Sequence, residues 1–71
     1  MKGKVTYLGV SRLGLMFGKI LDESGVSYYF DGRSLKKGSM NDYQTGMSVT
    51  FEIDQHKHEN AVNVEKEEAL I

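Results

Sequence analysis

The sequence predicts a single all-β domain of five short strands. Apolar and polar residues alternate along several segments, which is the period of a strand with one buried face. Glycine-rich and polar stretches separate these segments, as turns between strands do. The chain has 71 residues, enough for one small domain with a modest core.

Composition limits the function classes without choosing one. The chain has no cysteine, which excludes a disulfide framework and a thiolate zinc site. The formal net charge is -1, so the chain as a whole does not carry the charge of a nucleic-acid binder. Basic residues concentrate in the first half, and Glu59, Glu65, Glu67 and Glu68 lie near the end. Both a basic face with an acidic tail and an ordinary mixed surface fit this pattern.

The N-terminal residues lead directly into an alternating segment rather than an apolar run. We therefore expect no signal peptide, no membrane span and no membrane partner, and a cytoplasmic location.

Residues 2–10 are predicted to form the first strand. They are rich in β-branched and aromatic residues and contain no proline. Gly3 and Gly9 are candidates for a bulge or a bend. Strict alternation places Val5 and Tyr7 on the same face, so an outward Tyr7 requires such an irregularity between them.

Residues 13–30 are predicted to form a hairpin that organises the domain. Its first limb places alternate side chains on one face, namely Leu13, Leu15, Phe17 and Lys19. Residues 22–25, Asp-Glu-Ser-Gly, have the chemistry of a turn. The second limb holds three consecutive aromatic residues, which cannot all point into one core. Alternation favours Tyr28 in the core, and Tyr29 on the outer face with Phe17.

Residues 31–45 are predicted to form a long loop with one short helical turn at residues 34–37. Leu35, Met40 and Tyr43 are its apolar anchors. A loop of this length in so small a domain is often functional, although a plain connection between two halves of a barrel also explains it.

Two further strands complete the pattern. Residues 47–54 alternate strictly, with Met47, Val49, Phe51 and Ile53 on the buried face. Residues 55–59 form a polar turn, and residues 60–64 form the last strand, with Val62 and Val64 inward. The barrel domain then spans residues 1–66, and residues 67–71 form a charged tail to which we assign no role.

Five strands with a hairpin-rich first half favour a five-stranded antiparallel barrel of the oligonucleotide-binding type. An SH3-like barrel is the nearest competitor on the pattern alone.

Five segments resemble the motifs of bacterial cold-shock domains. Residues 3–8, GKVTYL, resemble the first strand, which opens Gly-x-Val-x-Trp-Phe. Residues 14–20, GLMFGKI, and 26–30, VSYYF, are similar to the two ribonucleoprotein motifs, Lys-Gly-Phe-Gly-Phe-Ile and Val-Phe-Val-His-Phe. Residues 46–53, GMSVTFEI, and 61–64, AVNV, resemble the fourth strand and the closing Ala-x-Asn-Val. The segments occur in family order over residues 3–64.

The sequence departs from these motifs at several positions. Tyr7 replaces the tryptophan, Ser27 replaces one phenylalanine, and His58-Glu59 replaces the Gly-Pro of the last hairpin. The first motif has two registers, in which either Leu15 and Phe17 or Phe17 and Lys19 occupy its phenylalanine positions. Each lost ring removes a stacking surface worth about 1–3 kcal/mol per base, so we expect weaker binding than the full motif gives.

The resemblance implies a cold-shock-type barrel that binds single-stranded RNA or DNA. By position, Tyr7, Tyr29 and Phe30 take stacking places, Met40 falls near the aromatic of the long loop, and Lys57 near a basic residue of the last hairpin. Independently, aromatic rings stack on bases of any kind and nearby cations meet phosphates. The complete predicted set is Lys4, Tyr7, Arg12, Leu15, Phe17, Lys19, Tyr29, Phe30, Met40 and Lys57.

The sequence therefore predicts binding of single-stranded nucleic acid, RNA in particular, without strong sequence preference. By resemblance, the role is that of an RNA chaperone or a modulator of transcription or translation in a cold-stress response. The alternative is a barrel that has lost nucleic-acid binding and contacts a protein through Met40, Tyr43 and the exposed rings. We expect a monomer in either case.

Catalytic and metal chemistry have little support in the sequence. No serine has a context that indicates activation, and so small a chain leaves little room for a substrate pocket. His56 and His58 lie beside Asp54 and Glu59, but no further fixed ligand is evident, which favours a solvated turn over a zinc site. We expect no enzymatic activity, no small-molecule substrate, no metal and no cofactor.

Overall fold

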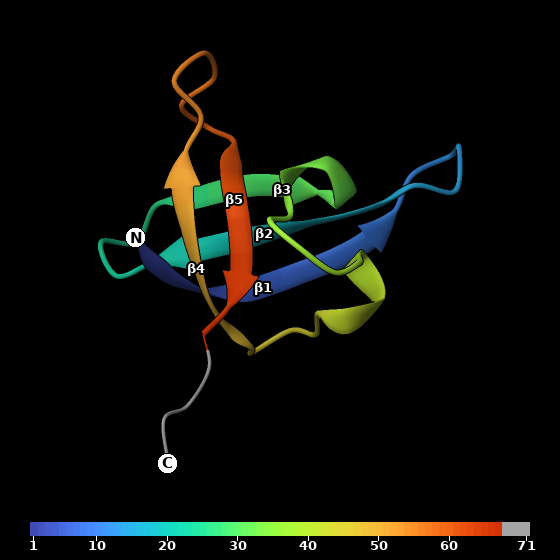
Figure 1. Ribbon diagram of the computed structural model, residues 1–71, viewed down its shortest axis with the longest axis horizontal. Helices are drawn as coiled ribbons and strands as arrows, with labels where there is room; N and C mark the ends of the chain where they lie inside the picture. Colours follow the sequence, from blue (N-terminus) through green and yellow to red (C-terminus); the bar gives the residue numbers. More distant parts are fainter. Residues whose placement is uncertain (68–71) are drawn as a thin grey trace.

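The computed structural model describes residues 1–67; residues 68–71, which hold most of the predicted tail, lie outside the described residues. The chain forms five strands: β1 (Lys2–Val10), β2 (Met16–Asp22), β3 (Ser27–Asp31), β4 (Ser48–Ile53) and β5 (Ala61–Lys66). They form one antiparallel sheet in the order β3-β2-β1-β4-β5. The sheet is strongly curled, so that β4 and β5 run steeply across β1, β2 and β3 (Figure 1). The all-β class and the five antiparallel strands are confirmed.

The first three strands form a meander with two tight connections. At the β1–β2 loop, the Ser11 N–H donates to the Leu15 carbonyl at 2.8 Å, and Gly14 supplies the positive φ of 78° that the loop needs. At the β2–β3 turn, one oxygen of Asp22 accepts from the Ser24 and Val26 N–H groups, both at 2.9 Å. The predicted hairpin turn is confirmed.

The β1 strand contains the irregularity that the sequence required. Its register against β2 shifts between Val5 and Tyr7, because Val5 lies opposite Ile20 whereas Tyr7 lies opposite Lys19. Two steps along β1 therefore match one step along β2, and Thr6 is the extra residue of a β-bulge. The bulge reverses the alternation of side chains beyond it.

The connection from β3 to β4 holds two short 3₁₀ turns, η1 (Gly32–Ser34) and η2 (Met40–Asp42). The helical turn predicted at residues 34–37 is misplaced. Asp31 caps η1 by accepting from the Arg33 N–H at 2.9 Å, so the turn begins earlier. Leu35 instead bridges to Val64, and the Lys36 N–H donates to the Val64 carbonyl at 2.9 Å, which holds this stretch extended beside β5.

The last two strands follow the prediction with two exceptions: β5 extends to Lys66 rather than ending at residue 64, and Val62 does not point into the core. In β4, Val49 and Phe51 are buried as alternation requires. In β5, Val64 is buried, but Val62 is only half-buried and Ala61 takes the other core position. The prediction for Val62 was wrong because Asn63 adopts a positive φ of 52° where the register against β4 shifts. This bulge places Ala61 and Val64 on the same side.

The core lies inside the curled sheet. It contains Val5, Ile20, Tyr28, Phe30, Met40, Tyr43, Val49, Phe51, Ala61 and Val64. Aromatic pairs connect its parts, with ring centroids 5.1 Å apart for Tyr28 and Phe51 and 6.0 Å apart for Phe30 and Tyr43. The predicted anchors of the long loop are confirmed, since Met40 and Tyr43 are buried and Leu35 packs against the core.

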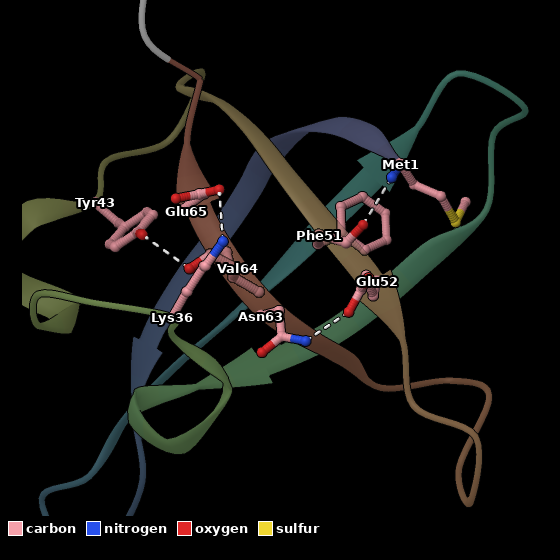
Figure 2. Close-up of polar contacts among 8 residues, drawn as sticks. All are labelled: Met1, Lys36, Tyr43, Phe51, Glu52, Asn63, Val64 and Glu65. Atoms are coloured by element: carbon pink, nitrogen blue, oxygen red, sulfur yellow. Dashed lines mark hydrogen bonds and ion pairs between the residues drawn. The ribbon is translucent and has the colours of Figure 1, made fainter.

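Polar contacts fix β4 and β5 to the rest of the chain (Figure 2). The Met1 amino group donates to the Phe51 carbonyl at 2.8 Å, and the Tyr43 hydroxyl donates to the Val64 carbonyl at 3.4 Å. Lys36 forms an ion pair with Glu65 at 3.6 Å. The C-terminal half of β5 is therefore tied to the β3–β4 connection, and β4 is tied to the N-terminus.

Candidate nucleic-acid interface

Three aromatic rings lie side by side on the outer surface of the meander. Tyr7, Phe17 and Tyr29 come from β1, β2 and β3, and Phe17 lies between the other two with ring centroids 5.9 Å from each. Phe17 is half-buried between them. Lys19 is exposed and lies opposite Tyr7 in one strand pair and opposite Tyr29 in the other. We call these four residues the aromatic face.

The bulge in β1 is what makes Tyr7 part of this face. Val5 is 1% exposed and Tyr7 is 51% exposed, although side chains two positions apart in a regular strand point to the same face. The extra residue Thr6 separates them. The sequence-based expectation that an outward Tyr7 needs an irregularity is confirmed.

A glycine makes room for the Tyr7 ring. Gly9 lies opposite Phe17 on the outer side of β1. A Cβ atom at Gly9 would lie 2.7 Å from the Tyr7 hydroxyl oxygen and 3.0 Å from the ring, closer than such atoms approach. The ring therefore lies over Gly9 and reaches toward Phe17, and a side chain there would displace it.

Tyr29 is held by a carboxylate of its own strand. Its ring is 36% exposed, and its hydroxyl donates to Asp31 at 3.3 Å. Partial burial raises the pKa of Tyr29, and the neighbouring Asp31 carboxylate raises it further. Tyr29 therefore remains a neutral hydrogen-bond donor. Its hydroxyl contacts Asp31 and its ring stacks on Phe17.

Two residues of the predicted set are buried rather than exposed on this face. Phe30 is 0% exposed and offers no surface to a ligand, whereas Met40 is 6% exposed and contributes only to the lining of the groove described below. Phe30 points inward because it follows the outward Tyr29 in a regular strand. Met40 begins η2 and packs into the core, where it anchors the long loop. Assigning Phe30 as a binding residue was wrong, and Met40 does not belong to the aromatic face.

The predicted basic residues are all exposed, but only Lys19 lies within the aromatic face. Lys4 lies beside the aromatic face on β1, where it is opposite Leu21 of β2. Arg12 is in the β1–β2 loop. Lys57 is in the β4–β5 loop, which reaches β3 where the Tyr29 N–H donates to the Glu59 carbonyl at 2.8 Å. The ion pairs within residues 1–67 are Lys2–Glu67 and Lys36–Glu65, so none of these four cations is neutralised by one.

A groove continues the aromatic face past Phe17 and Tyr29. Its volume is about 440 Å³, and its lining comes from the β1–β2 loop, the end of β3 and the start of η2. Leu15 of the predicted set lies here, exposed in the loop before β2 rather than within the strand. The polar lining residues Asp31, Arg33 and Asn41 were not part of the predicted set. For Asp31 and Arg33 the available signal was their position two and four residues after the outward Tyr29.

Comparison with models of known protein families found no match to this chain, and comparison with curated proteins found none either. Within residues 1–67 no three His, Cys, Asp or Glu side chains are grouped so that they could hold a metal ion. No helix in that part of the chain has the length and apolar character needed to cross a bilayer.

Proposed function

We propose that the protein binds single-stranded nucleic acid, RNA in particular, on the aromatic face. One observation carries the proposal: three at least partly exposed rings from three adjacent strands share one outer surface with a lysine that has no ion-pair partner within residues 1–67. A folded domain gains little by exposing aromatic rings, because burying them contributes much of its stability. Their arrangement matches what a base-stacking surface needs.

The proposed fold is a closed barrel of the oligonucleotide-binding, cold-shock type. The contact between β3 and the start of β5 supports it. Tyr29 forms a parallel bridge to Asn60, and its N–H donates to Glu59, so the two outermost strands of the sheet approach one another. This is the contact through which a curled five-stranded sheet would close.

Binding would combine stacking with phosphate contacts. Because neighbouring rings already touch one another, bases would stack on their exposed surfaces rather than between them. Each stacked base contributes about 1–3 kcal/mol whatever its identity. Lys19 within the face, and Lys4 and Arg12 beside it, would neutralise phosphates and make the affinity depend on salt.

A fluorescence titration tests the proposal. The probe is a labelled U-rich RNA of about eight nucleotides, a length within the range that such barrels cover. Titrations at about 50 mM and about 200 mM salt should show saturable binding that weakens as salt rises. A matched duplex should bind more weakly, because its bases are not free to stack. Absence of binding at the lower salt concentration would refute the proposal.

Protein binding is the second candidate, and one feature favours it. Val10, Leu13 and Leu15 are 63%, 85% and 61% exposed around the β1–β2 loop, an apolar tip of the kind that protein partners cover. The contacts first expected for this alternative, Met40 and Tyr43, are buried and unavailable. If the titration finds no binding, this tip is the surface to test next.

A role as an RNA chaperone or as a modulator of transcription or translation belongs to the same proposal and rests on the resemblance to cold-shock domains. So do a cytoplasmic location, a monomeric state and the absence of enzymatic activity.

A further inference from the structure

The groove beside Phe17 and Tyr29 differs chemically from the aromatic face. Rings stack on every base, but this groove also presents a carboxylate, a guanidinium and a side-chain amide, from Asp31, Arg33 and Asn41. Phe17 and Tyr29 belong both to the aromatic face and to the lining of the groove. A nucleic-acid strand lying on the rings would therefore continue directly into the groove. At about 440 Å³ the groove has room for one unstacked base.

Hydrogen bonds already fix the position of Asp31. One oxygen accepts from the Arg33 N–H at 2.9 Å and from the Ser34 hydroxyl at 3.5 Å, and the other accepts from the Tyr29 hydroxyl at 3.3 Å. A carboxylate has about four lone-pair positions, so the oxygen that Tyr29 contacts can accept a further donor from a ligand. Its negative charge repels phosphate, which favours a base edge rather than the backbone at this place.

We propose that this groove selects guanine. Guanine is the base that offers two adjacent N–H donors on its Watson–Crick edge, which suit a carboxylate, and two acceptors, O6 and N7, which suit an arginine. Asp31 and Arg33 supply this pair from one short segment, and both line the groove. The inference rests on the proposed function and adds to it a preference at one nucleotide of the bound strand.

The first experiment compares RNAs of one length. A U-rich octamer, and the same octamer with a single G, A or C placed at each position in turn, are titrated by fluorescence anisotropy. We expect one position at which G binds about tenfold or more tightly than A or C, because a bidentate contact discriminates by that order. Equal affinities for all four bases at every position would overturn the inference but leave the proposed function intact. Failure of every RNA to bind would overturn both.

The second experiment changes the donor pattern. Asp31→Asn keeps an oxygen to accept from the Arg33 N–H, but it presents one donor and one acceptor, as adenine requires. The preference at the selective position should shift from G toward A. Asp42→Asn is the matched control: the Asp42 carboxylate also accepts from a backbone N–H at a 3₁₀ turn, that of Ser39 before η2, and it lines a different groove. A preference for G that persists in Asp31→Asn would overturn the assignment of this residue.

Arg33→Lys guards against misfolding of the Asp31 variant. It keeps the positive charge and the Arg33 backbone N–H that Asp31 caps, but it loses the planar fork that contacts two acceptors at once. Selectivity for G should fall severalfold, while affinity for the U-only octamer stays within about twofold. Equal losses for both RNAs would show that Arg33 meets phosphate and would overturn its role in base selection.

Discussion

Aromatic rings and cations occur on two sides of this small domain, and the two sides use them differently. On the aromatic face, Tyr7, Phe17 and Tyr29 are at least partly exposed and Lys19 has no ion-pair partner within residues 1–67. Beside β5, by contrast, Tyr43 is 4% exposed, Lys66 lies 6.0 Å from its ring centroid, and Lys36 is paired with Glu65 (Figure 2).

The groove on the β5 side shows that the presence of aromatic and basic residues does not by itself make a binding surface for nucleic acid. It is the larger of the two, about 600 Å³, but its lining includes the carboxylates Asp42, Glu65 and Glu67. These charges repel phosphate, and Glu65 and Glu67 form ion pairs with Lys36 and Lys2. The same residue types therefore stabilise the fold on one side, and remain free to meet a ligand on the other.

The largest expected effect is the loss of stability on replacing Phe30, the buried neighbour of the outward Tyr29. Phe30→Ala removes a fully buried side chain and should destabilise the domain by about 3–5 kcal/mol, which is most of the stability of a chain this small. Tyr29→Ala, one residue earlier, should cost much less stability because its ring is on the surface. Urea denaturation of both variants checks this. Similar losses would contradict the assignment of the two faces.

Phe17→Ala should give the next largest effect, on binding rather than folding. Phe17 contacts both other rings of the aromatic face, so its loss removes one stacking surface and loosens two more. We expect RNA affinity to fall by roughly 5- to 150-fold, as about 1–3 kcal/mol implies. Tyr43→Phe is the control, because it keeps the core ring and leaves the aromatic face untouched. If Phe17→Ala unfolds the protein, Phe17 belongs to the core.

A smaller effect, on the salt dependence of RNA affinity, should distinguish Lys19 from Lys36, which is paired with Glu65. Lys19→Ala removes one phosphate contact and should reduce the slope of log affinity against log salt by about 1. Lys36→Ala removes a cation that already has a partner in Glu65, and should leave the slope unchanged. Titrations of both variants at several salt concentrations distinguish them. Equal changes in slope would indicate that the nucleic acid does not bind preferentially to the aromatic face over the β5 side.

The smallest expected effect concerns alkaline pH. Burial raises the pKa of Tyr43 above its ordinary value of 10.0, and the carboxylates of Asp42 and Glu65 raise it further. The folded state therefore holds the phenolic proton more tightly than the unfolded state does. Its contribution to stability is complete below pH 10.0, and is lost as pH rises through the higher pKa of the folded state.

Denaturation midpoints measured between about pH 8 and pH 11 check this expectation. The midpoint should fall at the alkaline end, and it should fall less steeply in Tyr43→Phe, which has no phenol to ionise. Tyr28, whose pKa burial and Asp22 also raise, remains in that variant and should keep part of the decline. A variant with an unchanged pH profile would show that Tyr43 does not contribute.

Local sequence patterns were sufficient to predict the strands and the direction of most side chains. Alternation placed Tyr28 inward and Tyr29 outward, and the Asp22–Gly25 turn followed from its residue chemistry. Period two is a local property of an extended backbone, so it can be read without knowledge of the fold. Even the bulge in β1 was inferable, because the two roles expected of Val5 and Tyr7 conflicted in a regular strand.

Features that depend on segments distant in the sequence were decided only by the tertiary structure. Alternation beside an outward Tyr29 already implies an inward Phe30, against the motif resemblance, but the burial of Met40 depends on the curled sheet that encloses it. The groove at Asp31, Arg33 and Asn41 assembles from parts of the chain that meet only after folding. The sequence by itself determined which residues form strands and which way the rings of the meander point. Tertiary packing determined which rings and cations remain free, because solvent exposure depends on every neighbouring segment rather than on one strand.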